Sequence, residues 1–488
     1  MILYFCNHLQ FIVTNKKLLC NETLGIIWYK LIILRKMDVS FMRIIKKLCA
    51  FTLSLCVFSA CSFAILGKNS IYSEEGSSQI YAYEKNNNNI NDKNSSLCFG
   101  VLSDVHIMKN KSRQDKKFKE ALDTLKQFAG GRLDTVAIAG DLADSGSKYE
   151  YRKLVKIYDN ELGKDRVKVF AMGNHDFFGY ADTKMCQNQF KRETLQKLND
   201  DKVIKGYHFI TVSTEDSSMN GRFGKNTRTW LKTQLDKAVK DDPEKPVFVI
   251  AHQPIRNTIY GSNEFSTIDL GKVINDYPQV IYFAGHSHRP LNDERMIYQK
   301  DFTAVGTGTI EEVGMEKTAA NHGDIVKNNI SQGLFVEVNG NKVSISRVDF
   351  LTKKIIGDKW VIEKPADKAA YKYTDMRKNY ASKPYFIMNS KIKLVKAKAN
   401  SLMLQFKKAY NVDKFIERYN IKIIDANTSK VIKSEYIFTN YFVANQSQTF
   451  NVLLDKLKHN HCYNVVITAV GEFGTESDNS IEGVFKTA

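Results

Sequence analysis

The sequence has few cysteines, and their positions match neither a disulfide framework nor a thiolate metal site. Eight occur in 488 residues, and five of them lie within the first 61 residues. The other three, Cys98, Cys186 and Cys462, are far apart in the chain. The sequence therefore predicts no disulfide framework and no Cys-x-x-Cys metal site.

Acidic residues are also scarce relative to basic ones. Lys and Arg outnumber Asp and Glu by 71 to 53, which gives a formal net charge of +18. This excess fits anionic partners such as phosphorylated substrates or an anionic cell envelope. The alternative is a compositional bias toward Lys, Asn and Ile without a dedicated basic site, and we predict no specific nucleic-acid binding. The 43% hydrophobic content indicates an ordinary globular core, and the length fits about two to four domains.

The N-terminal region has the pattern of an export signal. Residues 42–66 start with basic side chains, continue as an uncharged apolar run and contain small residues before Cys61. The segment "FSAC" resembles the lipobox of bacterial lipoproteins, in which Cys61 would carry the lipid. The apolar run is also about long enough for a membrane anchor. We predict an exported bacterial protein, either extracellular or attached to the cell envelope, whose membrane contact is limited to this anchor or lipid.

Two further N-terminal segments flank this signal. A signal should open a protein, so residues 1–41 are interpreted as a non-native or extra leader. Residues 67–95 are polar, rich in Asn and without periodicity. This composition predicts a disordered linker between the envelope and the folded part of the chain.

From residue 96 onward, short apolar runs alternate with helical patterns. Strands are predicted within 97–106, 133–144, 166–176, 245–254 and 279–288. Helices are predicted at 118–131, 148–163 and 228–240. Alternating strands and helices indicate a layered α/β fold with nearly all-apolar buried strands.

Polar residues follow the end of each of these five strands. They are Asp104, His106, Asp141, Asp144, Asn174, His175, Asp176, His252, His286 and His288. Any one of them has an ordinary explanation as a turn or a hydrogen-bonded histidine. Together they include five of the ten histidines, all at the carboxyl ends of strands in what we predict to be one sheet.

This set of residue types points to metal binding. Imidazole, carboxylate and amide oxygen form a ligand set suited to Zn, Mn, Fe or Co, whereas thiolate sites are absent from the pattern. The side chains are too many for one ion, but two ions sharing a bridging carboxylate would use them. Two-metal sites hold their ions about 3.5 to 4 Å apart and catalyse in-line displacement at phosphorus.

The motifs "SDVH", "GDLAD", "GNHD", "AHQP" and "GHSH" resemble, in order, those of the calcineurin-like metallophosphoesterase superfamily. The resemblance covers residues 96–350 and implies a four-layer α/β/β/α sandwich with two divalent ions. It implies that the first ion is held by Asp104, His106, Asp141 and His288. It implies that the second ion is held by Asp141, Asn174, His252 and His286.

The resemblance also implies a mechanism for a hydrolase acting on phosphoric ester bonds. A metal-bridging hydroxide would attack phosphorus in line, and His175, oriented by Asp144, would protonate the leaving oxygen. Asp176 would support the ligand loop without binding a metal. Arg256 and Arg289 follow ligand motifs and are candidates for holding phosphate oxygens, although both could also be ordinary surface charges.

Departures from the family pattern narrow the subclass. Protein phosphatases of the superfamily carry Arg where this chain has Ser145, and purple acid phosphatases carry a Tyr ligand where it has Asp144. The segment "GDLADSG" with one "GHSH" is most similar to the class III cyclic-nucleotide phosphodiesterase branch. We therefore expect a phosphodiesterase for a small phosphoester such as a nucleotide. The alternatives are a phosphomonoesterase or nucleotidase and a non-catalytic surface binding protein.

The rest of the chain is predicted to be largely strands. Residues 334–350 alternate around an Asn-Gly turn, which predicts a hairpin that closes the catalytic domain's second sheet. Residues 351–383 are interpreted as a charged connector. Short strands in residues 384–488 predict a β-sandwich that resembles a fibronectin type III domain, with Tyr463 as its corner tyrosine. By fold analogy this domain would contact a cell-envelope polymer.

Overall fold

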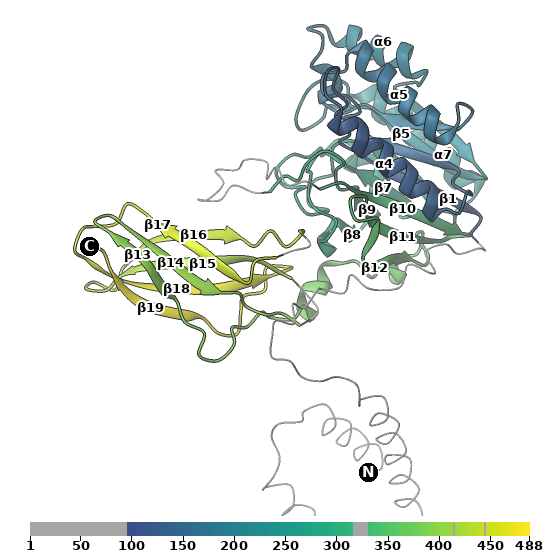
Figure 1. The fold of residues 1–488 in the computed structure, drawn as a ribbon. Helices are drawn as coiled ribbons and strands as arrows, with labels where there is room; N and C mark the ends of the chain where they lie inside the picture. Colours follow the sequence, from purple (N-terminus) through teal and green to yellow (C-terminus); the bar gives the residue numbers. More distant parts are fainter. Residues whose placement is uncertain (1–94, 316–329, 413–414, 444–445) are drawn as a thin grey trace, which may run out of the picture. The chain divides into compact units, whose positions relative to one another are not determined.

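The computed structural model describes residues 95–315, 330–412, 415–443 and 446–488, all within the unit Ile80–Ala488 (Figure 1). The predictions for residues 1–41 and 42–66, for Cys61, and for all but the last residue of 67–95 lie outside the described residues. None of the described helices is long and apolar enough to span a bilayer.

A first six-stranded sheet is built around three parallel strands. Its order is β12-β11-β10-β1-β2-β3. Strands β1, β2 and β3 are parallel, and β10 pairs with β1 in the antiparallel sense. The strands are β1 (Leu97–Leu102), β2 (Thr135–Ala139), β3 (Lys168–Ala171), β10 (Gln332–Asn339), β11 (Lys342–Asp349) and β12 (Lys354–Ile362).

A second six-stranded sheet has the order β4-β5-β6-β7-β9-β8. Strands β5, β6, β7 and β9 are parallel, and β4 and β8 are antiparallel edge strands. The strands are β4 (Asn199–Ile204), β5 (Tyr207–Val212), β6 (Val247–Ala251), β7 (Val280–Ala284), β8 (Ile297–Gln299) and β9 (Thr303–Gly306).

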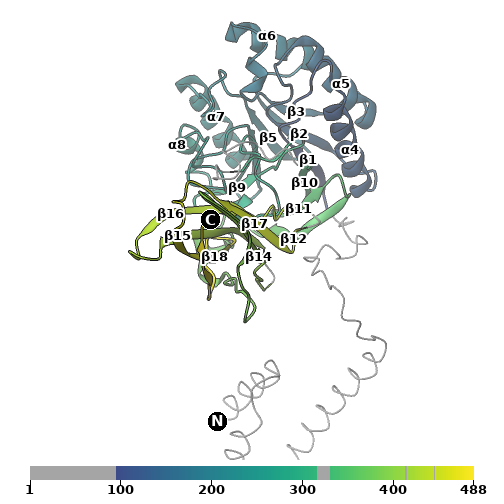
Figure 2. The same ribbon diagram turned by 60° about the vertical axis from the view of Figure 1, so that its left-hand side comes forward.

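The two sheets pack against each other, and helices cover their outer faces. The ring of Phe99 on β1 lies 4.9 Å from that of Phe209 on β5 and 4.8 Å from that of Phe248 on β6. Figure 2 shows α4 and α5 beside β1–β3, and α7 and α8 on the other side. The helices are α4 (Arg113–Phe128), α5 (Lys148–Leu162), α6 (Thr183–Thr194), α7 (Lys225–Asp241) and α8 (Gly271–Ile274). The predicted four-layer α/β/β/α sandwich is confirmed.

Two details of the predicted sheets are wrong. The five strands that precede the polar clusters belong to two sheets, with β1, β2 and β3 in the first and β6 and β7 in the second. The predicted hairpin is β10–β11, and it joins β1 in the first sheet. Periodicity does not identify a strand's partner here, because β1, β2, β6 and β7 are all buried on both faces and have the same pattern. Strand β12 extends the first sheet to Ile362, past residue 350.

The C-terminal region is an all-β sandwich, as predicted. Its sheets have the orders β13-β14-β17 and β16-β15-β18-β19. The strands are β13 (Lys393–Lys398), β14 (Ser401–Lys407), β15 (Ile416–Asp425), β16 (Val431–Phe438), β17 (Thr449–Leu454), β18 (Cys462–Gly471) and β19 (Ile481–Lys486). One apolar cluster, with Tyr419 and Tyr463 among its largest members, fills the space between the sheets. Between the two folded regions lie the short 3-10 helices Lys368–Ala370 and Asp375–Tyr380.

Tyr463 has the contact expected of a corner tyrosine. Its ring is buried, and its hydroxyl accepts a hydrogen bond from the backbone N–H of Lys458 at 2.7 Å. Replacing Tyr463 with Phe should destabilise the C-terminal sandwich by about 1 kcal/mol, since the N–H loses its acceptor. Amide hydrogen exchange in β18 measures this loss, and Tyr380→Phe on an exposed connector ring is the matched control. Unchanged protection in β18 would show that the hydroxyl contributes nothing.

Candidate metal centre

The predicted polar residues of the two sheets lie together at one edge of the sandwich. Loops leaving the carboxyl ends of β1, β2 and β3 meet those leaving β6 and β7, because face-to-face sheets place these ends side by side. Three groups of side chains have ligand atoms close enough to share a metal ion. The groups are Asp104, His106 and His288; His106, Asp141 and His175; and Asp141, His252 and His286.

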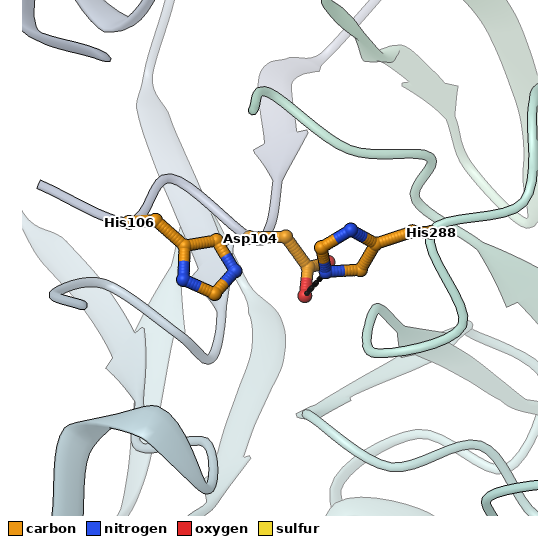
Figure 3. Close-up of side chains that lie close together, drawn as sticks. All are labelled: Asp104, His106 and His288. Atoms are coloured by element: carbon orange, nitrogen blue, oxygen red, sulfur yellow. Dashed lines mark ion pairs between the residues drawn. The ribbon is translucent and has the colours of Figure 1, made fainter. Parts of the chain in front are cut away.

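The first group surrounds the carboxylate of Asp104. Figure 3 shows His106 and His288 on opposite sides of it, with Nε2 of His288 3.0 Å from Oδ1 of Asp104. Nδ1 of His288 lies 2.9 Å from the carbonyl oxygen of Glu312. Because a carbonyl only accepts, Nδ1 carries the proton, and Nε2 is the atom available to a metal.

The second group is arranged around Asp141. Nε2 of His252 lies 3.1 Å from Oδ2 of Asp141, and Nδ1 of His286 lies 3.2 Å from the same Nε2. Nδ1 of His252 donates to the carbonyl oxygen of Ala139 at 2.9 Å, which again leaves Nε2 for a metal. Asp141 also lies 3.8 Å, through Oδ2, from Nε2 of His106. Asp141 therefore belongs to two of the three groups and lies between them.

Three buried side-chain atoms of the site have no hydrogen-bond partner among the described residues. They are Nε2 of His106, Oδ1 of Asn174 and Nε2 of His286. A buried polar atom left without a partner costs about 1–3 kcal/mol. All three atoms belong to predicted ligands, and a cation is a partner suited to each lone pair. The donor set therefore fits divalent metal ions.

Five of the candidate ligand residues have a left-handed backbone. Their φ values are between 48° and 67°, and they are Asp104, His106, Asp141, His286 and His288. A non-glycine residue in this region costs about 1–2 kcal/mol. Such strain at five positions of one site is typical of a functional centre that the surrounding structure holds in place.

Glycines allow the ligand loops to approach one another. A Cβ on Gly173 would lie 2.2 Å from Oδ1 of Asp141, so that any other residue would displace the carboxylate. Gly140 has φ +80°, and a Cβ there would lie 2.4 Å from the side chain of His252. Close packing therefore requires glycine at both positions, and the positive φ of Gly140 is a second reason at that position.

The protonation states in the site suit metal binding. Burial alone would raise the pKa of Asp104, but the charge and hydrogen bond of His288 together with the charge of His252 outweigh it and lower the pKa to about 2. Burial lowers the pKa of His106 to about 4 and that of His286 to about 3, so both rings are neutral near pH 7. Burial opposes the charged form of His252, yet Asp141 raises its pKa to about 9. The two carboxylates thus favour positive charge between them, as a metal ion would provide.

His175 and Asp144 lie at the open side of the site. Nδ1 of His175 is 3.2 Å from the main-chain oxygen of Asp144, and the carboxylate of Asp144 is 3.9 Å away. The backbone carbonyl is thus the nearer group that orients the imidazole. The side chains of His175 and Asp144 are 32% and 40% exposed, whereas those of Asp104 and Asp141 are buried.

Asp176 ties two ligand loops together. Its buried carboxylate accepts from the N–H groups of Gly173 at 2.8 Å and Ala143 at 3.2 Å, and from the hydroxyl of Tyr151 at 3.1 Å. Burial raises its pKa to about 7. The side chain connects the turn after β3 to the turn after β2 and does not belong to any of the three groups.

The two predicted phosphate-binding arginines have different surroundings. Arg256 is exposed, and its Nε lies 3.4 Å from Oγ of Ser266. Arg289 is buried, and its guanidinium donates to both oxygens of Glu264 at 2.8 Å and to the carbonyl oxygen of Gly314 at 2.7 Å. Arg289 therefore joins two loops beside the site.

Sequence reasoning missed residues that hold the ligands from behind. The hydroxyl of Ser103 donates to Oδ2 of Asp104, and the hydroxyl of Thr307 donates to that of Ser103 at 2.7 Å. The carbonyl of Glu312 fixes the ring of His288. Because a single Ser or Thr and a main-chain oxygen have no pattern in a sequence, only the tertiary structure identifies them.

The predicted ligands all lie within a segment that matches a known family. Residues 98–290 match the model of the calcineurin-like phosphoesterase family. A cAMP/cGMP dual specificity phosphodiesterase of Mycobacterium tuberculosis is 27% identical to this chain over 231 residues, which are 43% of this chain and 70% of that protein.

Two solved structures are similar to parts of this chain at low sequence identity. A purple acid phosphatase from seeds of yellow lupin (Lupinus luteus) is 14% identical, with a TM-score of 0.39, and the match covers 55% of this chain and 53% of that one. An fn3 domain of the human collagen alpha-1(XX) chain is 18% identical, with a TM-score of 0.17, and the match covers 22% of this chain and 87% of that one.

Proposed function

We propose, from the premise that residues 98–290 form a calcineurin-like phosphoesterase domain, that this chain hydrolyses small phosphodiesters with two divalent metal ions. The domain makes the chain a hydrolase acting on phosphoric ester bonds. The proposal that two metal ions are used rests on the position of Asp141, whose carboxylate is shared by two adjacent groups of candidate ligands.

The residues present would hold two ions around Asp141. Candidates for one ion are Asp104, His106 and His288, which form one group, and Asp141, which shares another group with His106. Candidates for the other are Asp141, Asn174, His252 and His286. Mn, Fe, Zn and Co suit these nitrogen and oxygen donors. When bound, such a pair of ions would lower the pKa of a bound water and neutralise charge on the phosphate.

The protein's own groups supply orientation and a proton. The candidate metal-ligand side chains are buried except that of His288, which is half-buried, so the substrate phosphate reaches them from the open side, where His175 and Asp144 lie. Nδ1 of His175 donates to the carbonyl oxygen of Asp144, which leaves Nε2 to hold a proton for the leaving oxygen. Asp176 keeps the two ligand turns at a fixed separation.

Two alternatives differ from this proposal in substrate or in chemistry. A phosphomonoesterase or nucleotidase would use the same ligands, and the name of the mycobacterial relative favours a diester. A non-catalytic binding protein would have no need of the full set of ligand positions. The chain keeps that set, and it also keeps His175 at the open side.

Metal-dependent turnover tests the proposal. The full chain is stripped of metal with a chelator, resupplied with Mn, Fe, Zn or Co, and assayed with bis(4-nitrophenyl) phosphate and 4-nitrophenyl phosphate. We expect turnover to be lost on stripping and restored by at least one metal, with the diester hydrolysed faster. A preference for the monoester would select the phosphatase alternative. Two bound ions without turnover of either ester would support the binding protein.

The N-terminal pattern and the C-terminal domain support an activity located at the cell envelope or outside the cell. We propose export through residues 42–66, with retention at the envelope through Cys61 or the apolar run. The C-terminal sandwich would then contact an envelope polymer, as a fibronectin-like module would. Mass spectrometry of the chain's N-terminus in the exported and cytoplasmic fractions tests the first part. A chain found unprocessed in the cytoplasmic fraction contradicts it.

A further inference from the structure

Three large apolar side chains beside the metal centre are exposed. Phe178 is 50% exposed, Met219 46% and Phe265 41%. Every other phenylalanine among the described residues is buried or half-buried. Single exposed apolar residues are normal on a protein surface, but several at one functional site indicate a binding surface.

Each of these side chains contacts a different residue of the site. The ring of Phe178 lies 4.5 Å from that of His175, with an interplanar angle of 49°. The ring of Phe265 lies 5.7 Å from that of His286. Sδ of Met219 lies 3.6 Å from Nδ2 of Asn174. The three come from separate loops, so their meeting at the site is a property of the tertiary structure.

The loops that carry Phe265 and Phe178 are held by their own contacts. Glu264, next to Phe265, forms a two-oxygen ion pair with the buried Arg289. The same loop is closed by a bond from the N–H of Arg256 to the carbonyl of Thr267 at 3.0 Å. Phe178 ends the 3-10 helix His175–Phe177, and its N–H donates to the carbonyl of His175.

Met219 lies on a turn with similar internal bonds. The N–H of Gly221 donates to the carbonyl of Ser218 at 2.9 Å, and the N–H of Glu215 donates to the carbonyl of Arg222 at 3.0 Å. The carboxylate of Glu215 in turn accepts from the N–H of Gly224 and from the hydroxyl of Thr227. All three exposed side chains therefore stand on preorganised loops, which lowers the entropic cost of binding.

We infer that Phe178, Met219 and Phe265, here named the apolar rim, bind a flat aromatic group, such as a nucleobase, on the phosphoester. This inference rests on the proposed function, which places the phosphorus at the metal centre. The organic part of the ester must then extend past the open side, where the ring of Phe178 packs on His175.

The composition of the apolar rim favours an aromatic ligand. Phenylalanine rings stack on flat ligands or meet them edge-on, and a methionine sulfur makes favourable contacts with ring edges. The three side chains carry no hydrogen-bonding group that reads a base edge. Because stacking accepts any π-face, the apolar rim should bind different bases with similar strength.

A pair of diesters with the same leaving group tests the apolar rim. Phenyl 4-nitrophenyl phosphate and methyl 4-nitrophenyl phosphate differ only in the group that stays on phosphorus. Intrinsic reactivity is the same for every variant, so a change in the ratio of their kcat/KM values reports binding of the ring. The variant with Phe178→Ala, Met219→Ala and Phe265→Ala should lower the phenyl-to-methyl ratio by about 10-fold. Single Ala variants should lower it by smaller amounts.

Matched controls exclude a general effect of truncation. Tyr380→Ala and Met388→Ala remove exposed apolar side chains from the connector and the C-terminal region and should leave the ratio unchanged. Phe178→Leu should have a phenyl-to-methyl ratio between those of Phe178→Ala and the wild type, since leucine is apolar but not flat. A triple variant that keeps its metal and the wild-type ratio overturns the inference.

Binding measurements separate this inference from the proposed function. If the wild type hydrolyses neither ester with any metal, the proposed function fails. Calorimetry of the metal-loaded protein with phenylphosphonate and methylphosphonate then still measures whether the apolar rim binds the phenyl ring. About 10-fold tighter binding of phenylphosphonate that is lost in the triple variant supports the inference, and equal binding of the two phosphonates contradicts it.

Discussion

Replacing Asp141 with Asn should lower kcat/KM for the diester by about 1,000-fold or more and reduce the number of bound metal ions. Losing several kcal/mol of transition-state stabilisation corresponds to a rate loss of about this size. The expected loss of kcat/KM is large because Asp141 is shared by two groups of candidate ligands. An amide is neutral and offers one oxygen where the carboxylate offers two.

The surroundings of Asp141 suggest that the variant keeps its fold. Oδ1 accepts from the N–H of His175 at 2.9 Å, a bond that the amide oxygen of Asn can also accept. Oδ2 faces Nε2 of His252 at 3.1 Å and Nε2 of His106 at 3.8 Å, which are the contacts that the substitution changes. The effect should therefore be confined to the metal centre.

Metal analysis and turnover measured together check this prediction. Atomic emission gives the ions bound per chain after metal resupply, and thermal unfolding reports the fold. Asp478→Asn, at an exposed position of the C-terminal sandwich, is the matched control and should retain full activity. An Asp141→Asn protein with two ions and wild-type turnover would rule out a bridging role for this carboxylate.

Replacing His175 with Ala should lower kcat for alkyl esters by about 100- to 10,000-fold. The imidazole is partly exposed, and its Nδ1 is held by the main-chain oxygen of Asp144, so Nε2 faces the open side of the site. An alkoxide is a poor leaving group and needs this proton. A 4-nitrophenolate leaves without it, and for 4-nitrophenyl esters the loss should be much smaller.

The dependence on the leaving group distinguishes proton donation from a structural role. The measurement compares kcat for a methyl ester and a 4-nitrophenyl ester in wild type and variant, with metal content determined in parallel. His459→Ala changes an exposed histidine of the C-terminal region and serves as the control. Equal losses for both esters, or a loss of bound ions, would show that His175 acts through the metal site.

The sequence predicts the central strands and helices well where local patterns are strong. The predicted helix 148–163 is α5, where a capping box between Ser147 and Glu150 marks the first turn. Helix α4 starts at Arg113, five residues before the prediction, because its first turn is polar. The strands β13, β16 and β19 have only a weak apolar pattern in the sequence, since many of their residues are exposed.

Pairing of strands could not be predicted from the sequence in the same way. Residues of β1 and β6 have the same all-buried pattern, yet they lie in different sheets. The choice depends on which partner is adjacent in space, a long-range property with no local signal. The hairpin β10–β11 likewise forms where its Asn-Gly turn predicts it, but it pairs with β1 of the first sheet.

The sequence by itself determined which residue types are available at the candidate metal centre, because these types and their positions after strands are local features. Only the tertiary structure decided the geometry. It brings two sheets' strand ends to one edge and holds five candidate ligand residues in left-handed conformations. It also leaves buried atoms of His106, Asn174 and His286 without hydrogen-bond partners among the described residues. It also decides that Phe177 enters the core while Phe178 faces solvent beside His175. The physical reason is that packing and strain depend on contacts between residues far apart in the chain, and motifs do not encode those contacts.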